Sequence, residues 1–349
     1  MKCKVEKLCG GCQLLKFSRD EQAKKKREMV EAIMERAHLD VKVAPVVMAE
    51  DDLFYRNKVI VGFAKDKSRK VFSGLYAARS HRVINTSGCV MQPKLVNEII
   101  DEITHLVDSM KIELYNERTG TGLLRHVMIR YAHSTNEVMV VFVTSTKMFP
   151  SRRNLVNVLV KKFPQIKTII QNINPRQTSI VMQDESIVLY GKGYITDVLC
   201  GLKISFTASS FYQIHSGQCE KLYEMARQML ALRSQDRVLD TYCGVGTIGL
   251  TLARLPRGDR RRAERGRGDD GEGERRPKRH SQRSIRRDGF DAVYEGGASV
   301  PSKIRRDRAG SAAGWNDEFV YRIGLLLAAE PDSLYFVRSQ NAGPGLDRV

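Results

Sequence analysis

Four cysteines are the residues of this chain whose types and spacing most directly suggest chemistry. They are Cys3, Cys9, Cys12 and Cys89. Five residues separate Cys3 from Cys9, two glycines separate Cys9 from Cys12, and Cys89 follows a Ser-Gly pair much later in the chain. Thiolates at such spacing suit zinc or an iron–sulfur cluster. From spacing alone, zinc, an iron–sulfur cluster and unligated core cysteines all stay open. Cys200, Cys219 and Cys243 are interpreted as core residues.

A glycine-rich loop between residues 238 and 250 is the second feature with chemical meaning. An apolar run ends at Asp240, Gly244 and Gly246 follow, and Thr247 opens a helical pattern. Glycines let the backbone approach a ligand closely, and the N-terminus of a helix favours negative or polar groups. This is how an S-adenosylmethionine site begins; the alternative is an ordinary tight turn between a strand and a helix.

The elements that must position these residues follow from apolar periodicity. Helical spacing predicts helices over 17–38, 94–110 and 217–232. Strand-like patterns fill 53–92 and recur at 126–131, 137–144, 168–173, 179–182, 187–189 and 237–241. The middle of the chain is therefore predicted to be an antiparallel α+β region, and the strand at 237–241 to open a doubly wound α/β domain.

Composition divides the chain near residue 254. The 349 residues suffice for two or three domains, and neither a signal peptide nor a long apolar run is present, which favours a cytoplasmic protein. Of the net charge of +18, residues 1–253 carry +12 with Lys and Arg mixed. Residues 254–349 hold 19 Arg, only 2 Lys and 13 of the 27 glycines. The first part is expected to bind RNA or DNA. The second is predicted to be poorly folded.

Together with Phe206–His215, these features resemble the RNA uracil-C5 methyltransferase family, particularly its iron–sulfur branch acting on 23S ribosomal RNA. The similarity covers about residues 3–253, including Gly122-Leu-Leu-Arg125-His126, Arg130 and Asn172-Ile-Asn174-Pro. It implies a [4Fe–4S] cluster on Cys3, Cys9, Cys12 and Cys89. It also implies RNA as the partner, with no DNA and no membrane, and a monomer.

The resemblance also implies S-adenosyl-L-methionine as cofactor and suggests its contacts. Gln213 corresponds to a residue that contacts the cofactor, and Phe211 to one near the target base. Tyr242 and Thr247 correspond to further cofactor contacts, beside Asp240, Gly244 and Gly246 of the loop. The sequence departs from the family at His215, where Asn is usual, and at its start, where many members carry a small RNA-binding β-barrel.

The family's reaction needs residues that should follow position 254. A cysteine thiolate attacks C6 of uracil, which makes C5 nucleophilic toward the sulfonium methyl group. A carboxylate then helps to remove the C5 proton. No cysteine follows Cys243, which belongs to the glycine loop and is not the nucleophile. The chain as translated is therefore predicted to have no catalytic residues of its own and to be inactive.

A change of reading frame near codon 254 would account for this. Codons exist for residues 258–264 that, read one base later, give Val-Ile-Gly-Val-Glu-Leu-Asn, the family's second strand. Residues 310–315 can likewise give Asp-Pro-Pro-Arg-Ala-Gly, and 336–346 can give Ser-Cys-Asp-Pro followed by Arg-Thr-Leu-Ala-Arg-Asp-Leu, the nucleophile motif. Three matches in the family's order indicate a frameshift, with the chain ending before the segment that bears the base. The alternative is a genuine basic tail that binds RNA.

The predicted fold class is α/β: a truncated, scrambled Rossmann-like methyltransferase domain preceded by an α+β central domain and an N-terminal iron–sulfur loop. The expected boundaries are 1–50 for the cysteine loop and helix, 51–205 for the central domain that supplies Cys89, 206–253 for the start of the cofactor domain, and 254–349 for the out-of-frame tail. The expected function is methylation of uridine C5 in 23S rRNA. The alternatives are a non-catalytic iron–sulfur RNA-binding protein, a tRNA-directed uridine methyltransferase, and a methyltransferase of another class.

Overall fold

The computed structural model describes residues 3–78, 80–178, 180–232 and 245–253, and the backbone of 283–287 and 290–294. The chain forms two compact units, one of residues 1–198 and 205–218, the other of residues 199–204 and 219–349. Among the residues just given, no helix has the length and apolar character needed to cross a membrane.

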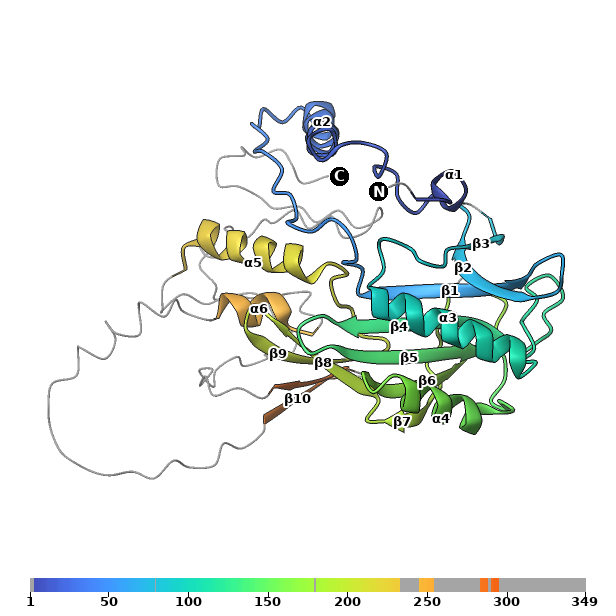
Figure 1. The fold of residues 1–349 in the computed structure, drawn as a ribbon. Helices are drawn as coiled ribbons and strands as arrows, with labels where there is room; N and C mark the ends of the chain where they lie inside the picture. Colours follow the sequence, from blue (N-terminus) through green and yellow to red (C-terminus); the bar gives the residue numbers. More distant parts are fainter. Residues whose placement is uncertain are drawn as a thin grey trace, which may run out of the picture. The chain divides into compact units, whose positions relative to one another are not determined.

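The helices and strands follow one another in a mixed order (Figure 1). They are α1 (Glu6–Cys9), α2 (Arg19–Arg36), β1 (Lys58–Lys65), β2 (Val71–Tyr76), β3 (Val83–Asn85), α3 (Lys94–Ser109), β4 (Leu124–Ala132), β5 (Glu137–Thr144), α4 (Arg152–Lys162), β6 (Ile166–Ile173), β7 (Ser186–Gly191), β8 (Tyr194–Leu199), β9 (Leu202–Thr207), α5 (Ser216–Leu230), α6 (Thr247–Leu252), β10 (Arg283–Arg287) and β11 (Phe290–Tyr294).

A seven-stranded sheet of order β3-β2-β1-β4-β5-β6-β7 forms the centre of the first unit. Its neighbouring strands are antiparallel except for β5 and β6, which are parallel. A parallel pair needs a crossover, and α4 provides it. The predicted antiparallel α+β region is thus a mixed sheet with one parallel pair.

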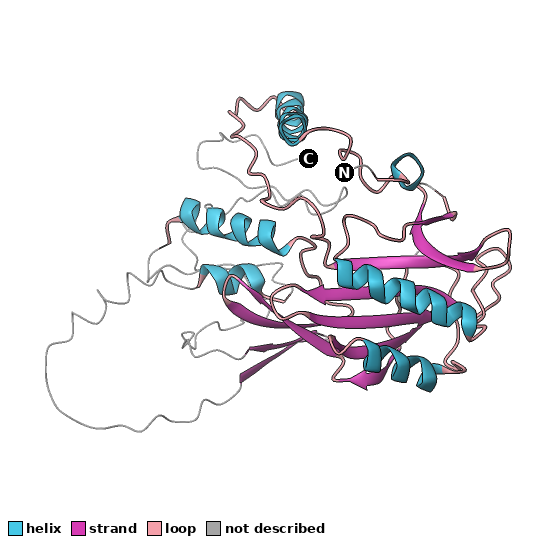
Figure 2. Cartoon of the chain, viewed as in Figure 1, coloured by secondary structure: helices cyan, strands magenta, loops and turns pink. Residues whose placement is uncertain are grey.

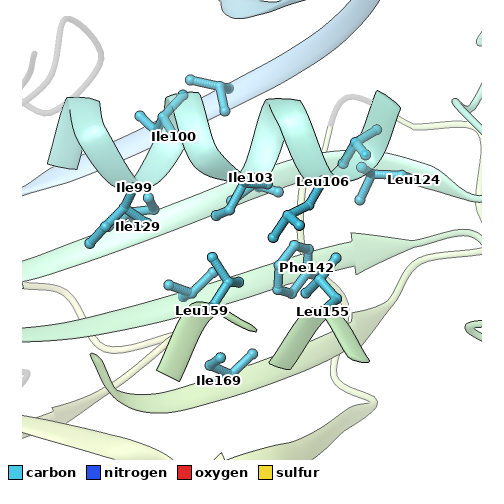
Figure 3. Packing of buried hydrophobic residues seen from close by; sticks show 14 of the residues in the cluster. Ile99, Ile100, Ile103, Leu106, Leu124, Ile129, Phe142, Leu155, Leu159 and Ile169 are labelled. Carbon is cyan, nitrogen blue, oxygen red and sulfur yellow. The ribbon is translucent and has the colours of Figure 1, made fainter. Parts of the chain in front are cut away.

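Helices α3 and α4 cover one face of this sheet (Figure 2). Ile99, Ile103 and Leu106 of α3 are buried, as the helical spacing of 94–110 predicts. They pack with Leu155 and Leu159 of α4 over the apolar residues of β4, β5 and β6 (Figure 3). Because burial of apolar area is the main stabilising contribution to folding, this layer fixes the sheet on which the rest of the unit is built.

The first predicted helix, 17–38, is confirmed as α2, but its apolar residues are not buried. Ser18 caps the helix in a capping box with Glu21, in which each side chain accepts from the other residue's backbone N–H. Within the described part of the chain, Met29 is 63% and Ile33 43% exposed. Local capping and helix-forming residues, rather than packing, therefore account for this helix.

Three further predictions have mixed outcomes. The helix over 217–232 is confirmed as α5, and the helix that opens at Thr247 is confirmed as α6. The strand predicted at 179–182 is wrong where the structure describes it. The carbonyl oxygens of Ile180 and Val181 accept hydrogen bonds from the Asn174 side-chain nitrogen instead of from a neighbouring strand. The strand predicted at 237–241 lies outside the described residues.

Two small sheets complete the description. β8 and β9 form one, and β10 and β11 form the other, in which Arg287 pairs with Phe290. Residues 254–349 are predicted to be poorly folded, so β10 and β11 differ from that prediction. Apolar alternation is weak there, which is why the pattern did not indicate a strand.

Candidate functional site

A buried arginine holds the chain where β9 ends. Arg130 of β4 is 2% exposed, and its guanidinium donates to the carbonyl oxygens of Thr207 and Ser210, each at 2.5 Å. The guanidinium carbon also lies 5.1 Å from the centre of the Phe206 ring. Burial lowers the pKa of Arg130 to about 10, so the group is still protonated near neutral pH. The segment after β9 is thus fixed at its start.

The middle of the same segment is held by a buried carboxylate. The Tyr212 ring stacks on Phe206 with 4.4 Å between ring centres, and its hydroxyl donates to Asp197 Oδ2 at 3.1 Å. Asp197 is fully buried and accepts further hydrogen bonds at Oδ1 from the backbone N–H groups of Ser134 and Val198, both at 2.9 Å. A buried carboxylate with three donors is well satisfied, so it forms a stable anchor.

Asn57, immediately before β1, holds the end of the segment. Its side-chain nitrogen donates to the Gln213 carbonyl oxygen at 2.7 Å, and its backbone N–H donates to the Ile214 carbonyl oxygen at 3.0 Å. His215 stacks on Tyr55 with 4.3 Å between ring centres. Its Nδ1 accepts from the backbone N–H of Gln218 at 3.3 Å, which is the hydrogen bond of a helix N-cap.

Residues 206–216 are hereafter called the clamped segment. Within it Phe211 is 58% exposed, whereas the adjacent Tyr212 is 4% exposed. Gln213 is half-buried, with its backbone fixed through Asn57. An exposed aromatic ring on a fixed backbone can stack on a planar ligand at little conformational cost. The structure thus places the two predicted residues, Phe211 and Gln213, on one pre-organised stretch of chain.

The described part of the predicted cofactor loop lies in the second unit. Gly246 has φ of +80°, a conformation that suits glycine, and α6 begins at the next residue. The Thr247 hydroxyl forms a 3.0 Å hydrogen bond with the Tyr223 hydroxyl, and the pKa of Tyr223 is raised by burial. Asp240, Tyr242 and Gly244 lie outside the described residues.

The four predicted cluster ligands are near one another but do not form a ligand set. Cys3, Cys9, Cys12 and Cys89 are half-buried and free of disulfides. Burial raises the pKa of Cys12 most, followed by the proximity of Cys89; Arg56 lowers it, and Cys9 and Cys3 add smaller increases. Among the described residues, no three Cys, His, Asp or Glu side chains gather closely enough to hold a metal ion.

Two of the remaining cysteines can be compared with the prediction that they are core residues, and Arg125 of the central motif binds backbone. Cys219 is buried, as predicted, with its pKa raised to about 12 by burial; Cys200 is half-buried; Cys243 lies outside the described residues. Arg125 donates to the carbonyl oxygens of Asn174 at 2.9 Å and Arg176 at 2.5 Å. The motif residues therefore fix backbone and do not project toward a ligand.

A shallow cavity of about 330 Å³ lies elsewhere on the first unit. It is lined by residues that follow α3, such as Met110, by residues just before β4, such as Leu123, and by residues that follow β5, such as Met148. None of its residues belongs to the clamped segment. Its polar lining residues include Lys111, Glu113 and Ser145, and the sequence analysis assigned no functional role to these three.

Sequence reasoning named Arg130 as a motif residue but missed its contacts with the clamped segment, and it missed Asn57 and Asp197 altogether. Asn57 contacts Gln213 across 156 positions, and Arg130 reaches Ser210 across 80. Asp197 had no motif around it. Only covariation between distant positions could have indicated these pairs, because local patterns carry no information about such long-range contacts.

Comparisons with known proteins place these observations in context. No family model matches the chain. It is 38% identical over 248 residues to an uncharacterized RNA methyltransferase of Oceanobacillus iheyensis, covering 70% of this chain and 54% of that one. A second such protein, from Halalkalibacterium halodurans, is 38% identical over 256 residues, 72% and 55% of the two chains. A third, from Staphylococcus aureus, is 37% identical over 255 residues, 72% and 56%. These relatives are named RNA methyltransferases.

The chain spans about half the length of the curated relatives it matches. Among solved structures it is similar to the Pyrococcus abyssi tRNA (uracil-54, C5)-methyltransferase in complex with S-adenosyl-L-homocysteine. The TM-score is 0.56 at 24% identity, over 70% of this chain and 56% of the other. The fold of the described chain is thus a mixed α/β fold like that of this enzyme.

Proposed function

We propose that this chain derives from an RNA (uracil-5-)-methyltransferase of the iron–sulfur branch, and that its clamped segment binds the target uridine, in 23S rRNA. The observation that carries the proposal is the exposed Phe211 ring on backbone held by Arg130, Asp197 and Asn57. The names of the relatives support RNA methylation as the reaction class. A tRNA uridine is the alternative substrate, which the name of the structural neighbour favours.

The proposed roles follow from chemistry and position. Phe211 stacks on the uracil ring and orients it. Gln213 contacts the cofactor through its side-chain amide, while its backbone is held by Asn57. Gly246 and Thr247 contribute backbone and hydroxyl contacts to the same cofactor, joined by Asp240, Tyr242 and Gly244 of the loop. S-adenosylmethionine, when bound, supplies an electrophilic methyl group.

The residues described near Thr247 fit such a cofactor. Gly246 is the N-cap of α6 in a left-handed conformation, and the first N–H groups of a helix have no carbonyl partner within the helix itself. A Cβ at Gly246 would meet only Leu250 at 3.5 Å, so the conformation rather than crowding explains the glycine. The Tyr223 hydroxyl orients the Thr247 hydroxyl.

We further propose that this chain does not itself complete the reaction. Attack on C6 of uracil requires a thiolate, and no cysteine follows Cys243. The test is transfer of a radioactive methyl group from S-adenosylmethionine to 23S rRNA and, separately, to tRNA. We expect no 5-methyluridine with this chain and its formation with a version whose frame is restored after codon 254. Formation of 5-methyluridine by the unaltered chain would refute the inactivity.

The frameshift has its own support and test. Three shifted stretches match the family's motifs in order, and the relatives match over 248 to 256 residues, close to the length of residues 1–253. Resequencing the gene around codons 245–260 tests it directly. An intact frame at that position would favour a genuine basic tail.

The cluster proposal rests on the donor set and its proximity. The proximity of Cys89, Cys9 and Cys3 raises the pKa of Cys12, and the four thiols would need to move closer to bind a [4Fe–4S] cluster. Iron and sulfide analysis of protein purified without oxygen, with visible absorbance, tests it. One tightly bound zinc ion in place of iron would overturn it.

The uridine contact is tested by substitution. Phe211→Ala is expected to weaken binding of a uridine-containing single-stranded RNA roughly tenfold or more, because one stacked base contributes about 1–3 kcal/mol. Tyr190→Ala is the matched control, since Tyr190 is 39% exposed on β7 outside the clamped segment. Equal losses in the two variants would contradict the role of Phe211.

A non-catalytic iron–sulfur RNA-binding protein is the second candidate. The net charge of +12 on residues 1–253 and the missing cysteine favour it. It predicts salt-dependent RNA binding without any methyl transfer, even when the frame is restored.

A further inference from the structure

The turn between β1 and β2 carries an unusual density of positive charge. Residues 65–70 read Lys-Asp-Lys-Ser-Arg-Lys, and all six are exposed. This stretch is hereafter called the basic turn. It contains four cations and one acid, and its position at the tip of a two-stranded hairpin leaves it accessible from several sides (Figure 1).

Asp66, the single acid of the basic turn, accepts hydrogen bonds from the backbone of the same turn. Asp66 Oδ1 accepts from the backbone N–H groups of Ser68 at 2.8 Å and Lys70 at 2.9 Å. Within the part of the chain that the structure describes, none of the four cations forms an ion pair. Their charges are therefore available to an anionic partner.

Backbone hydrogen bonds hold the basic turn in one conformation. The N–H of Asp66 donates to the Lys70 carbonyl oxygen, and the N–H of Arg69 to the Asp66 carbonyl oxygen, each at 3.0 Å. Below the turn, Val71 donates its N–H to Asp108 Oδ1 of α3 at 3.4 Å. A turn held in this way presents its charges with a lower conformational cost on binding than a loose loop would.

The basic turn and the clamped segment lie at opposite ends of one strand. Asn57, which holds Gln213, directly precedes β1, and Lys65 ends it. The eight residues of β1 span about 25 Å at roughly 3.3 Å per residue. A ligand that reaches both ends must therefore be a long polyanion. The basic turn has no apolar side chain to insert into a bilayer, which favours a nucleic acid over a lipid surface.

We propose that the basic turn binds the sugar–phosphate backbone of the RNA, about 25 Å along β1 from the end that holds the clamped segment. It serves as a second anchor, which contributes affinity and orientation without reading bases. The inference rests on the proposed function in one respect only, that the ligand is RNA.

The test uses the full chain and a fluorescent single-stranded RNA of roughly 20 nucleotides, with affinity measured between about 50 and 200 mM salt. The variant Lys67→Gln/Arg69→Asn/Lys70→Gln removes three cations; Asn is chosen because Arg69 has φ of +63°. We expect a loss of roughly 10- to 100-fold at low salt, and a salt dependence shallower by about 2, since each single-strand contact contributes about 0.7. A dinucleotide, too short to span β1, should not distinguish the variant from the parent.

The matched control is Lys24→Gln/Lys26→Gln/Lys42→Gln, which removes the same charge from exposed positions in and after α2. Equal losses in both variants, or none in the first, would overturn the proposal while leaving RNA binding by the chain intact. If the parent chain binds no RNA, both this inference and the proposed function fail. If the chain bound phosphatidylserine vesicles more tightly than RNA, the partner of the basic turn would be a membrane surface and the proposal would be wrong. Lys67→Gln alone, whose side chain supports no turn hydrogen bond, guards against misfolding and should change the salt dependence by about 0.7.

Discussion

Two buried arginines of one strand hold two different loops, and the loops differ in what they leave exposed. Arg125 and Arg130, five positions apart on β4, each donate to two backbone carbonyl oxygens. Arg125 closes the stretch 174–186, and Arg130 fixes the clamped segment. Asn172 and Asn174 then bind the first stretch along its length, with side-chain hydrogen bonds to Gln183, Glu185, Ile180 and Val181.

The electrostatic surroundings of the two arginines also differ. Arg125 forms an ion pair with Glu117 at 3.2 Å and lies 4.3 Å from the Tyr115 ring centre. Arg130 has no carboxylate within ion-pair distance among the described residues, and its charge is satisfied by carbonyl oxygens and the Phe206 ring. The same device thus fixes two stretches, and each leaves an apolar side chain exposed: Ile180, 61% exposed, in the first, and Phe211, 58% exposed, in the clamped segment. Only the second offers an aromatic face for stacking.

The largest expected effect is that of Arg130→Met. It leaves the carbonyl oxygens of Thr207 and Ser210 without their donor, which should cost about 2–4 kcal/mol of unfolding free energy, measured by urea denaturation. Uridine binding at Phe211 should fall with it, because the clamped segment loses its first anchor. Hydrogen exchange of residues 207–216 should rise selectively.

Arg125→Met is the matched comparison for Arg130→Met, because it removes the other buried arginine of β4. It should destabilise the fold by about 1–3 kcal/mol, since Glu117 is partly exposed and can be hydrated when its partner is gone. Uridine binding by the folded variant should stay near that of the parent. A loss of binding as large as that of Arg130→Met would show that the two regions are not independent.

The second prediction concerns pH and applies only to the region of Arg125. His126 is buried beside Arg125 and bonds the Tyr76 hydroxyl at 3.1 Å; burial, and then Arg125, lower its pKa from 6.5 to about 4. The unfolded chain therefore binds a proton that the folded chain does not between pH 6.5 and 4. The stabilisation is present above pH 6.5 and is lost as the pH falls toward 4, by at most about 3 kcal/mol.

This pH dependence is measured as the change in urea midpoint between pH 7 and 4. His126→Gln should reduce it, because the amide does not titrate and can still meet Tyr76. Carboxylates titrate in the same range in both proteins, so the difference between the two curves, rather than either curve, isolates His126. Parallel curves would contradict the lowered pKa.

Sequence patterns predicted elements well and their anchors poorly. The period of α3 follows from burial on one face, and the continuous apolar run of β5 follows from burial on both faces; a local window records both patterns. The roles of Phe211 and Gln213 came from resemblance to a family and stay predictions; the structure adds that Phe211 is exposed and Gln213 half-buried. Asn57 and Asp197 could not be found, because their contacts join distant positions and the residues themselves are of common types.

The motif residues show a second limit. Arg125, Asn172 and Asn174 stand out in the sequence as candidates for function, yet their side chains bind backbone carbonyl oxygens. A polar residue with unusual spacing indicates a buried hydrogen-bond requirement as readily as a ligand site. The exposed fraction of the side chain distinguishes a buried hydrogen-bonding residue from a ligand-binding one, and that fraction is a property of the tertiary structure.

A third, smaller effect is expected for Tyr212→Phe. The change keeps the stack on Phe206 but removes the donor to Asp197 Oδ2, which then lies buried with one acceptor atom unsatisfied. We expect a loss of about 1–2 kcal/mol in unfolding free energy. Uridine binding should fall less than in Arg130→Met, since the two terminal anchors persist. An unchanged stability would mean that water replaces the hydroxyl at Asp197.

The smallest effect is expected at His215, the position where the sequence departs from the family that it resembles. Its Nδ1 accepts the Gln218 N–H at the start of α5, as an Asn side chain does at an N-cap, so His215→Asn should preserve the cap and lose only the stack on Tyr55. A second variant, His215→Ala, also removes the cap and so separates the two contributions. We expect His215→Asn to lower the unfolding free energy by about 0.5–1 kcal/mol, and His215→Ala to lower it by about 1 kcal/mol more. Equal losses for Asn and Ala would mean that the imidazole acts through the Tyr55 stack alone. If so, the departure from Asn would reflect the end of the clamped segment and not the beginning of the helix.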